Sequence, residues 1–108
     1  MNFFLEADRG TMTLARFTLK LQAYAAYYET KKHEEKFKIR HFRVLTVTTS
    51  ETRRSNLVAA AQREEALRRL GRMFLFTEDS KLSLEQPESM FQNIWISLSG
   101  TDPHSILA

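Results

Sequence analysis

The sequence predicts a single α/β domain over residues 1–108, with a mainly parallel sheet of about three to four strands in β-α-β-α-β order and helices packed on it. The length of 108 residues supports one hydrophobic core. Short apolar runs alternate with stretches of helical periodicity, which is typical of parallel strands joined by right-handed crossovers. Hydrophobic residues make up 43% and charged residues 27%, so we expect a globular domain rather than disorder.

The first strand and helix are predicted in the N-terminal third. Residues 3–8 (FFLEAD) read as a buried strand interrupted by two acids, and Gly10 in the following turn can adopt positive φ. Thr11 can cap a helix over residues 13–30, where apolar residues recur at spacings of 3 and 4. The stripe consists of Leu14, Phe17, Leu21, Tyr24 and Tyr28, with Ala25 beside them. Residues 31–43 (KKHEEKFKIRHFR) should end the helix in an exposed, basic connection.

A central strand and a second helix follow. Residues 42–49 (FRVLTVTT) are β-branched and apolar with little alternation, which favours a strand covered on both faces. Thr49 or Ser50 can cap the next helix, and Glu51 suits its first turn. The apolar positions of this helix are Leu57, Val58, Ala61, Leu67 and Leu70, and Gly71 should end it.

The C-terminal third predicts shorter elements. Residues 73–77 (MFLFT) should form a third strand, and residues 79–88 a loop with about one helical turn. Residues 93–99 (NIWISLS) could add a fourth strand at an edge. From about residue 100 we expect a surface tail anchored by one or two apolar residues.

Several function classes lack their usual sequence signals. Cysteine is absent, which removes disulfides, thiolate metal sites and cysteine nucleophiles. No GxSxG, P-loop or GxGxxG motif occurs, and the three histidines are scattered. No apolar run approaches the ~20 residues that cross a bilayer, so we expect a cytoplasmic protein with no membrane partner.

The two acids of the first strand form the first candidate site. Glu6 and Asp8 are two residues apart, so they lie on one face of a strand at its carboxyl end, where ligands of parallel sheets tend to bind. Two carboxylates at this spacing could share Mg²⁺ or Mn²⁺. The alternative is an acid pair on an edge strand that deters aggregation or pairs with nearby cations.

Two residues of the first helix complete this candidate site. Lys20 and Tyr24 are one turn apart and flank the apolar stripe, so both could lean over the end of the strand that carries Glu6. The lysine could orient a water or steady a phosphate oxygen. In the alternative, Tyr24 is a core residue and Lys20 lies at the boundary of the core with its ammonium in water.

The net charge of +3 permits a nucleic-acid partner. Candidate contacts are Arg9 in the first turn and Lys36, Lys38, Arg40 and Arg43 in the basic connection, where aromatic residues are interleaved. A second basic group comprises Arg53, Arg54, Arg63, Arg68, Arg69 and Arg72. The alternative is a solvated connector and a helix face paired with neighbouring glutamates.

The stretch FFLEADRGT, with the helix segment FTLKLQAY, then FRVLTVTTSETRRSNL, MFLFT and a late Ile94-Trp95, resembles the C-terminal part of the replication-relaxation family of plasmid and mobile-element proteins. The resemblance covers about residues 3–98, and its most specific element is E-x-D-R-G-T with the downstream Lys20 and Tyr24. Members typically carry a winged-helix DNA-binding part ahead of this segment. The resemblance therefore implies a role in plasmid replication, with DNA as partner.

The same stretch is similar to the core of the PD-(D/E)xK nucleases, in which a strand with an E-x-K signature precedes a helix and another strand. Asp8 stands at the lysine position of that signature, and Lys20 is the evident substitute. The resemblance implies a restriction-endonuclease-like core and metal-dependent phosphodiester hydrolysis, with Glu6 and Asp8 holding the ion and Lys20 assisting. Glu6, Asp8, Lys20 and Tyr24 are the expected catalytic group, although we expect this chain alone to be inactive.

A second hypothesis comes from a different class. The chain could be a non-catalytic interaction or dimerisation module whose acids only cap the first helix region. An open edge of its sheet could then be covered by a second copy in a homodimer.

Overall fold

The computed structural model describes residues 2–32, 42–82, 85–100, 103 and 105–106. The elements follow the order β1 (Asn2–Ala7), α1 (Leu14–Lys32), β2 (Phe42–Thr48), α2 (Glu51–Gln62), α3 (Glu65–Arg69), β3 (Phe74–Glu78) and β4 (Ile96–Ser97), with 3₁₀ turns at η1 (Asp79–Lys81) and η2 (Pro87–Phe91). These elements form a small α/β domain with a mostly parallel sheet, which confirms the predicted fold class at that level.

Within the described residues the sheet has four strands in the order β1-β2-β3-β4. β2 pairs in parallel with β1 and with β3, while the two-residue β4 pairs antiparallel at the other edge. The register places Glu6 beside Thr46 and Val44 beside Phe74. β2 is therefore the central strand that its apolar sequence predicts.

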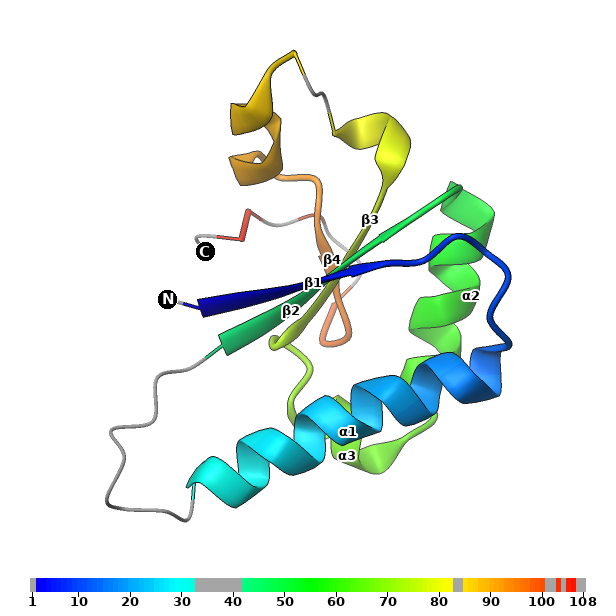
Figure 1. Ribbon diagram of the computed structural model, residues 1–108, viewed down its shortest axis with the longest axis vertical. Coiled ribbons are helices and arrows are strands. Elements are labelled where there is room, and N and C mark those ends of the chain that lie inside the picture. Colours follow the sequence, from blue (N-terminus) through cyan, green and yellow to red (C-terminus); the bar gives the residue numbers. More distant parts are fainter. Residues whose placement is uncertain (1, 33–41, 83–84, 101–102, 104, 107–108) are drawn as a thin grey trace.

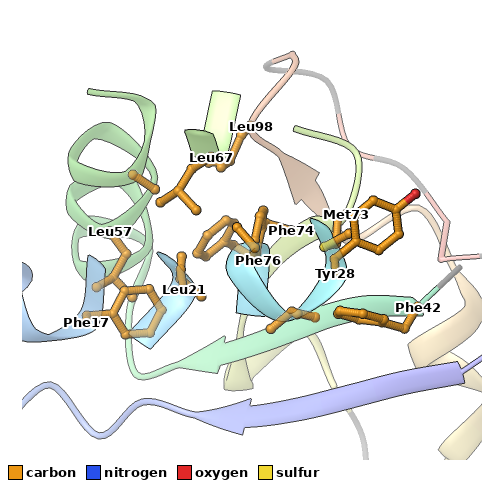
Figure 2. Close-up of a cluster of buried hydrophobic side chains, with 13 residues drawn as sticks. Phe17, Leu21, Tyr28, Phe42, Leu57, Leu67, Met73, Phe74, Phe76 and Leu98 are labelled. Carbon is orange, nitrogen blue, oxygen red and sulfur yellow. The ribbon is translucent and has the colours of Figure 1, made fainter. Parts of the chain in front are cut away.

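The helices pack on one face of the sheet. The main cluster joins Phe17 and Leu21 of α1 and Leu57 of α2 to Phe74 and Phe76 of β3, and Figure 2 shows these side chains between helix and sheet. Figure 1 shows the three labelled α-helices together on one side of the strands. Both crossovers between adjacent parallel strands lead to the same side of the sheet, which is why the helices share one face.

The other face is covered by the C-terminal segments. Trp95 and Ile106 pack against Leu45 and Leu75 in a second cluster, and the indole N–H of Trp95 donates to the carbonyl of Met90 at 2.8 Å. This cover stops short of β1. The side chain of Leu5 is 68% exposed, so β1 is an edge strand rather than the buried one expected from its sequence.

Two local details differ from the predictions, and the cap of α2 agrees with them. The N-terminus of α1 is capped by Thr13 and not by Thr11, since the Thr13 hydroxyl accepts from the N–H of Arg16 at 3.1 Å. The predicted second helix is two helices, α2 and α3, interrupted at Arg63 and Glu64. Ser50 is the N-cap of α2, and its hydroxyl accepts from the N–H of Arg53 at 3.0 Å.

Candidate functional site

Glu6, Lys20 and Tyr24 lie together near the carboxyl end of β1. The ammonium of Lys20 is 2.6 Å from Glu6 Oε2, and the hydroxyl of Tyr24 donates a hydrogen bond to Glu6 Oε1. The carboxylate is 13% exposed and the lysine side chain 43% exposed, so the cluster reaches the surface on its lysine side. Both partners come from α1 at positions i and i+4, the spacing that places side chains on one helix face.

An aromatic contact orients Tyr24 toward β1. The ring of Phe4 lies 5.4 Å from that of Tyr24 and 5.0 Å from that of Phe42. Phe4 and Glu6 share the helix side of β1 because strand side chains alternate. The tyrosine body therefore packs on Phe4 while its hydroxyl reaches Glu6, two residues further along.

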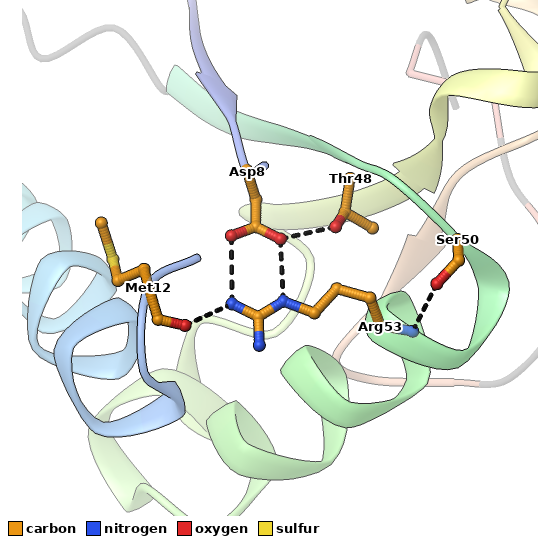
Figure 3. A network of polar contacts seen from close by, with 5 residues as sticks. All are labelled: Asp8, Met12, Thr48, Ser50 and Arg53. Atoms are coloured by element: carbon orange, nitrogen blue, oxygen red, sulfur yellow. Dashed lines mark hydrogen bonds and ion pairs between the residues drawn. The ribbon is translucent and has the colours of Figure 1, made fainter. Parts of the chain in front are cut away.

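Asp8 belongs to a separate, more buried network (Figure 3). Arg53 binds it through two bonds, Nε to Oδ2 at 2.9 Å and Nη2 to Oδ1 at 3.1 Å, and Thr48 donates to Oδ2 at 2.5 Å. Arg53 also donates to the carbonyl of Met12 at 2.6 Å. One guanidinium thus joins the carboxyl end of β1, the turn before α1 and the first turn of α2.

A small cavity lies between the two networks. Its volume is about 180 Å³, and its lining includes Glu6, Asp8, Arg9 and Lys20 together with Phe17. Both carboxylates line this cavity at the carboxyl end of β1. They are nevertheless held by different cations, Glu6 by Lys20 and Asp8 by Arg53.

These contacts shift three pKa values. Burial raises the pKa of Asp8, but the hydrogen bonds from Arg53 and Thr48, the guanidinium charge and the N–H of Gly10 outweigh it, and the net pKa is below the usual range. The hydrogen bond to Asp8 raises the pKa of Arg53 against the opposing effect of burial. Burial, followed by the hydrogen bond and charge of Glu6, raises the pKa of Tyr24 to about 12.

The donor set is not arranged for a divalent cation. A metal site needs carboxylate oxygens that are free to coordinate, whereas Glu6 and Asp8 both accept charged or polar donors on both oxygens. The described residues contain no group of three or more histidine, cysteine, aspartate or glutamate side chains that could hold a metal. Mg²⁺ or Mn²⁺ at this position stays a prediction, and the ion would have to displace Lys20 and Arg53.

The predicted nucleic-acid contacts do not form one group in the described structure. Arg9 lines the cavity at the carboxyl ends of the strands, while Arg43 is the second residue of β2, at the opposite end. The guanidinium of Arg43 donates to the carbonyl of Ile106 at 2.9 Å. Lys36, Lys38 and Arg40 lie outside the described residues.

Arg53 and Thr48 are site residues that the sequence pattern does not indicate. The pattern groups Asp8 with Glu6 and assigns Arg53 only to a general basic group. A signal was present, because α2 begins directly after β2 and its first turn therefore lies at the same sheet edge as the end of β1. Arg54 acts similarly on the next strand, with its Nε 2.9 Å from Oε2 of the buried Glu78.

Comparisons with protein-family models, curated proteins and solved structures find no match for this chain. The likeness to replication-relaxation proteins and to PD-(D/E)xK nucleases thus stays a prediction from the sequence. Among the described residues, no helix has the length and apolar character needed to span a membrane.

Proposed function

We propose that this chain is a nucleic-acid-associated domain of a plasmid or mobile-element replication-relaxation protein, with a nuclease-like core in β-α-β-α-β order. The observation that supports the proposal most is the 2.6 Å contact between Lys20 on α1 and Glu6 on β1. In the nuclease resemblance, Lys20 on the helix substitutes for the strand lysine of the E-x-K signature, and its contact with Glu6 supports that substitution. The proposed partner is DNA.

The proposed domain binds DNA without cleaving it in this form. Hydrolysis by this class of core requires a metal-binding carboxylate pair, and here Arg53 and Lys20 neutralise Asp8 and Glu6. The side chain of Lys20 is the more exposed member of its ion pair with Glu6, so Lys20 is the residue of this cluster that would reach a phosphate oxygen.

DNA binding is tested with a labelled duplex over a series of salt concentrations. The wild-type affinity should fall steeply as salt increases, because phosphate contacts release counterions. A variant with Lys36→Gln, Lys38→Gln and Arg40→Gln should bind more weakly. The control carries Arg16→Gln, Arg63→Gln and Lys81→Gln, which remove the same charge elsewhere. Absence of duplex binding by the wild type would refute the proposal.

Cleavage is tested separately by incubating supercoiled plasmid with the protein and Mg²⁺ or Mn²⁺. We expect no nicking above the level given by Glu6→Ala. Nicking by the wild type that is lost in Glu6→Ala would show that the held carboxylates do act, and it would replace the non-cleaving form of the proposal by a nuclease.

A second candidate function is a dimerisation module. β1 is an edge strand, and on the face away from the helices its side chains Phe3 and Leu5 are 36% and 68% exposed. Such an edge is a template for pairing with another copy. Size-exclusion chromatography with light scattering tests this second function by measuring the molar mass over a range of protein concentrations. A monomer at every concentration would exclude pairing through β1.

A further inference from the structure

A second basic surface lies at the end of the sheet opposite to Glu6. It is an open groove of about 550 Å³ between the start of β2, the C-terminal part of α1 and the turn that follows α3. Its lining includes four arginines, Arg43, Arg68, Arg69 and Arg72, and no described carboxylate. The cavity beside Glu6, in contrast, has two acids against two bases in its lining.

Four positively charged side chains in the lining of one groove repel one another in the absence of an anion. The C-terminal end of α3 favours Arg68 and Arg69, but Arg43 and Arg72 come from β2 and from the turn, where no helix terminus accounts for them. The charge concentration therefore matches an anionic ligand.

The arginines differ in how far they are already occupied. Arg68 donates to the carbonyl of Gln62 at 3.0 Å, and Arg43 donates to Ile106. Arg69 and Arg72 are exposed, and within the described part of the chain neither side chain has a hydrogen bond or an ion pair. The predicted pairing of this basic group with neighbouring glutamates is therefore not seen for these two residues.

The groove is formed on a well-packed base. Tyr28, Phe42 and Met73 are buried beneath it, with the rings of Tyr28 and Phe42 5.7 Å apart, and Figure 2 shows the three side chains grouped at one end of the core. Gly71 allows close packing of the turn, since a Cβ there would lie 3.1 Å from the backbone nitrogen of Ser99. The guanidinium groups are thus carried on fixed backbone.

We infer that this arginine groove binds the phosphodiester backbone of a nucleic acid, with Arg69 and Arg72 as the main phosphate contacts. The inference rests on the proposed function and adds to it the surface that the nucleic acid occupies. Arginine suits this role because its planar fork can bind two phosphate oxygens at once. A nucleic acid bound in this groove would lie at the amino ends of the β-strands, away from Glu6.

The test compares binding of a labelled 20-base-pair duplex, a probe size on the order of two helical turns, to wild type and to Arg69→Gln/Arg72→Gln. The control is Arg16→Gln/Arg63→Gln, which removes the same charge from exposed positions outside the groove. We expect about ten-fold weaker binding for the groove variant near 150 mM salt, and a salt slope smaller by about 2, because each lost phosphate contact removes about 0.9 from the slope. Arg69→Lys/Arg72→Lys should restore most of the salt slope.

The outcomes separate the two proposals. Equal losses of duplex affinity in the groove variant and the control would overturn the assignment of the groove as the binding surface, while leaving nucleic-acid association intact. No binding by the wild type would overturn both. Isothermal titration with a nucleoside triphosphate provides the last comparison, since tighter binding of the mononucleotide than of the duplex would reassign the groove to a small phosphorylated ligand. Circular dichroism melts of each variant verify that the fold is retained.

Discussion

Arg53 binds both carboxylate oxygens of Asp8 although the two residues are 45 positions apart in the chain. Asp8 has a side chain only 2% exposed and Arg53 one 16% exposed, so the pair is largely shielded from water. A buried charge is tolerated only when it is paired and hydrogen-bonded. The pair therefore fixes the carboxyl end of β1 against the first turn of α2.

Removing one partner of this pair should destabilise the protein strongly. Asp8→Ala leaves the Arg53 guanidinium without its counter-charge, and we expect a loss of about 3 kcal/mol in the free energy of unfolding. The double variant Asp8→Ala/Arg53→Met should lose less free energy of unfolding than Asp8→Ala and Arg53→Met lose together, because it buries no unpaired charge. Urea denaturation of the wild type, the two single variants and the double variant measures these free energies. Additive losses would show that the two side chains are not coupled.

The same pair predicts a loss of stability in acid. The folded pKa of Asp8 is below its unfolded value of ~3.9, so the unfolded chain binds the proton first as pH falls. The stability from Asp8 is complete above the unfolded pKa and disappears as pH falls through the folded pKa. Urea midpoints between about pH 5 and pH 2 should therefore decrease less in Asp8→Asn than in wild type. Parallel curves would assign acid unfolding to other groups.

Tyr24 predicts the opposite dependence in alkali. Its folded pKa is raised to about 12, so its neutral form is favoured in the fold. The stability from this group is complete below the unfolded pKa of ~10 and is lost as pH rises through the folded value. Absorbance near 295 nm should contain a phenolate transition near pH 12 that is absent in Tyr24→Phe. A Tyr24 transition near pH 10 would contradict its hydrogen bond to Glu6.

Gly10 should be sensitive to any side chain. Its φ of +80° lies in the left-handed region that L residues avoid, and its N–H donates to Asp8. We expect Gly10→Ala to cost about 1 kcal/mol in the free energy of unfolding, and Gly10→Asn less. Thermal melts of both variants beside wild type provide the measurement. An unchanged melting temperature for Gly10→Ala would mean that the turn can adopt another conformation.

The sequence was sufficient where one periodic pattern decided the structure. The helix stripe from Phe17 to Tyr28 and the apolar run of β2 both depend on burial of regularly spaced side chains, and the structure has both. The contact of Lys20 with Glu6 was also predictable, because a strand end and the next helix are close in sequence. These predictions required only local geometry.

The remaining features depend on contacts between distant segments. The pairing of Asp8 with Arg53 follows from the order of the elements and not from residue spacing, since it requires the placement of β2 and α2 relative to β1. The apolar residues of β1 predict a buried strand for the same reason. They do not show that Trp95 and Ile106 cover only the neighbouring strands. The sequence likewise does not show that Arg69 and Arg72 line the same groove, because this depends on how the turn after α3 packs.

The ladder between β1 and β2 joins the segments on either side of residues 33–41 through six residue pairs, from Asn2 with Phe42 to Ala7 with Val47. The helix-side core and the Asp8–Arg53 pair connect the same two segments. A polypeptide cut once between them would therefore yield two fragments with complementary surfaces. Mixed in solution, such halves should reassociate into a non-covalent heterodimer that reproduces the intact domain.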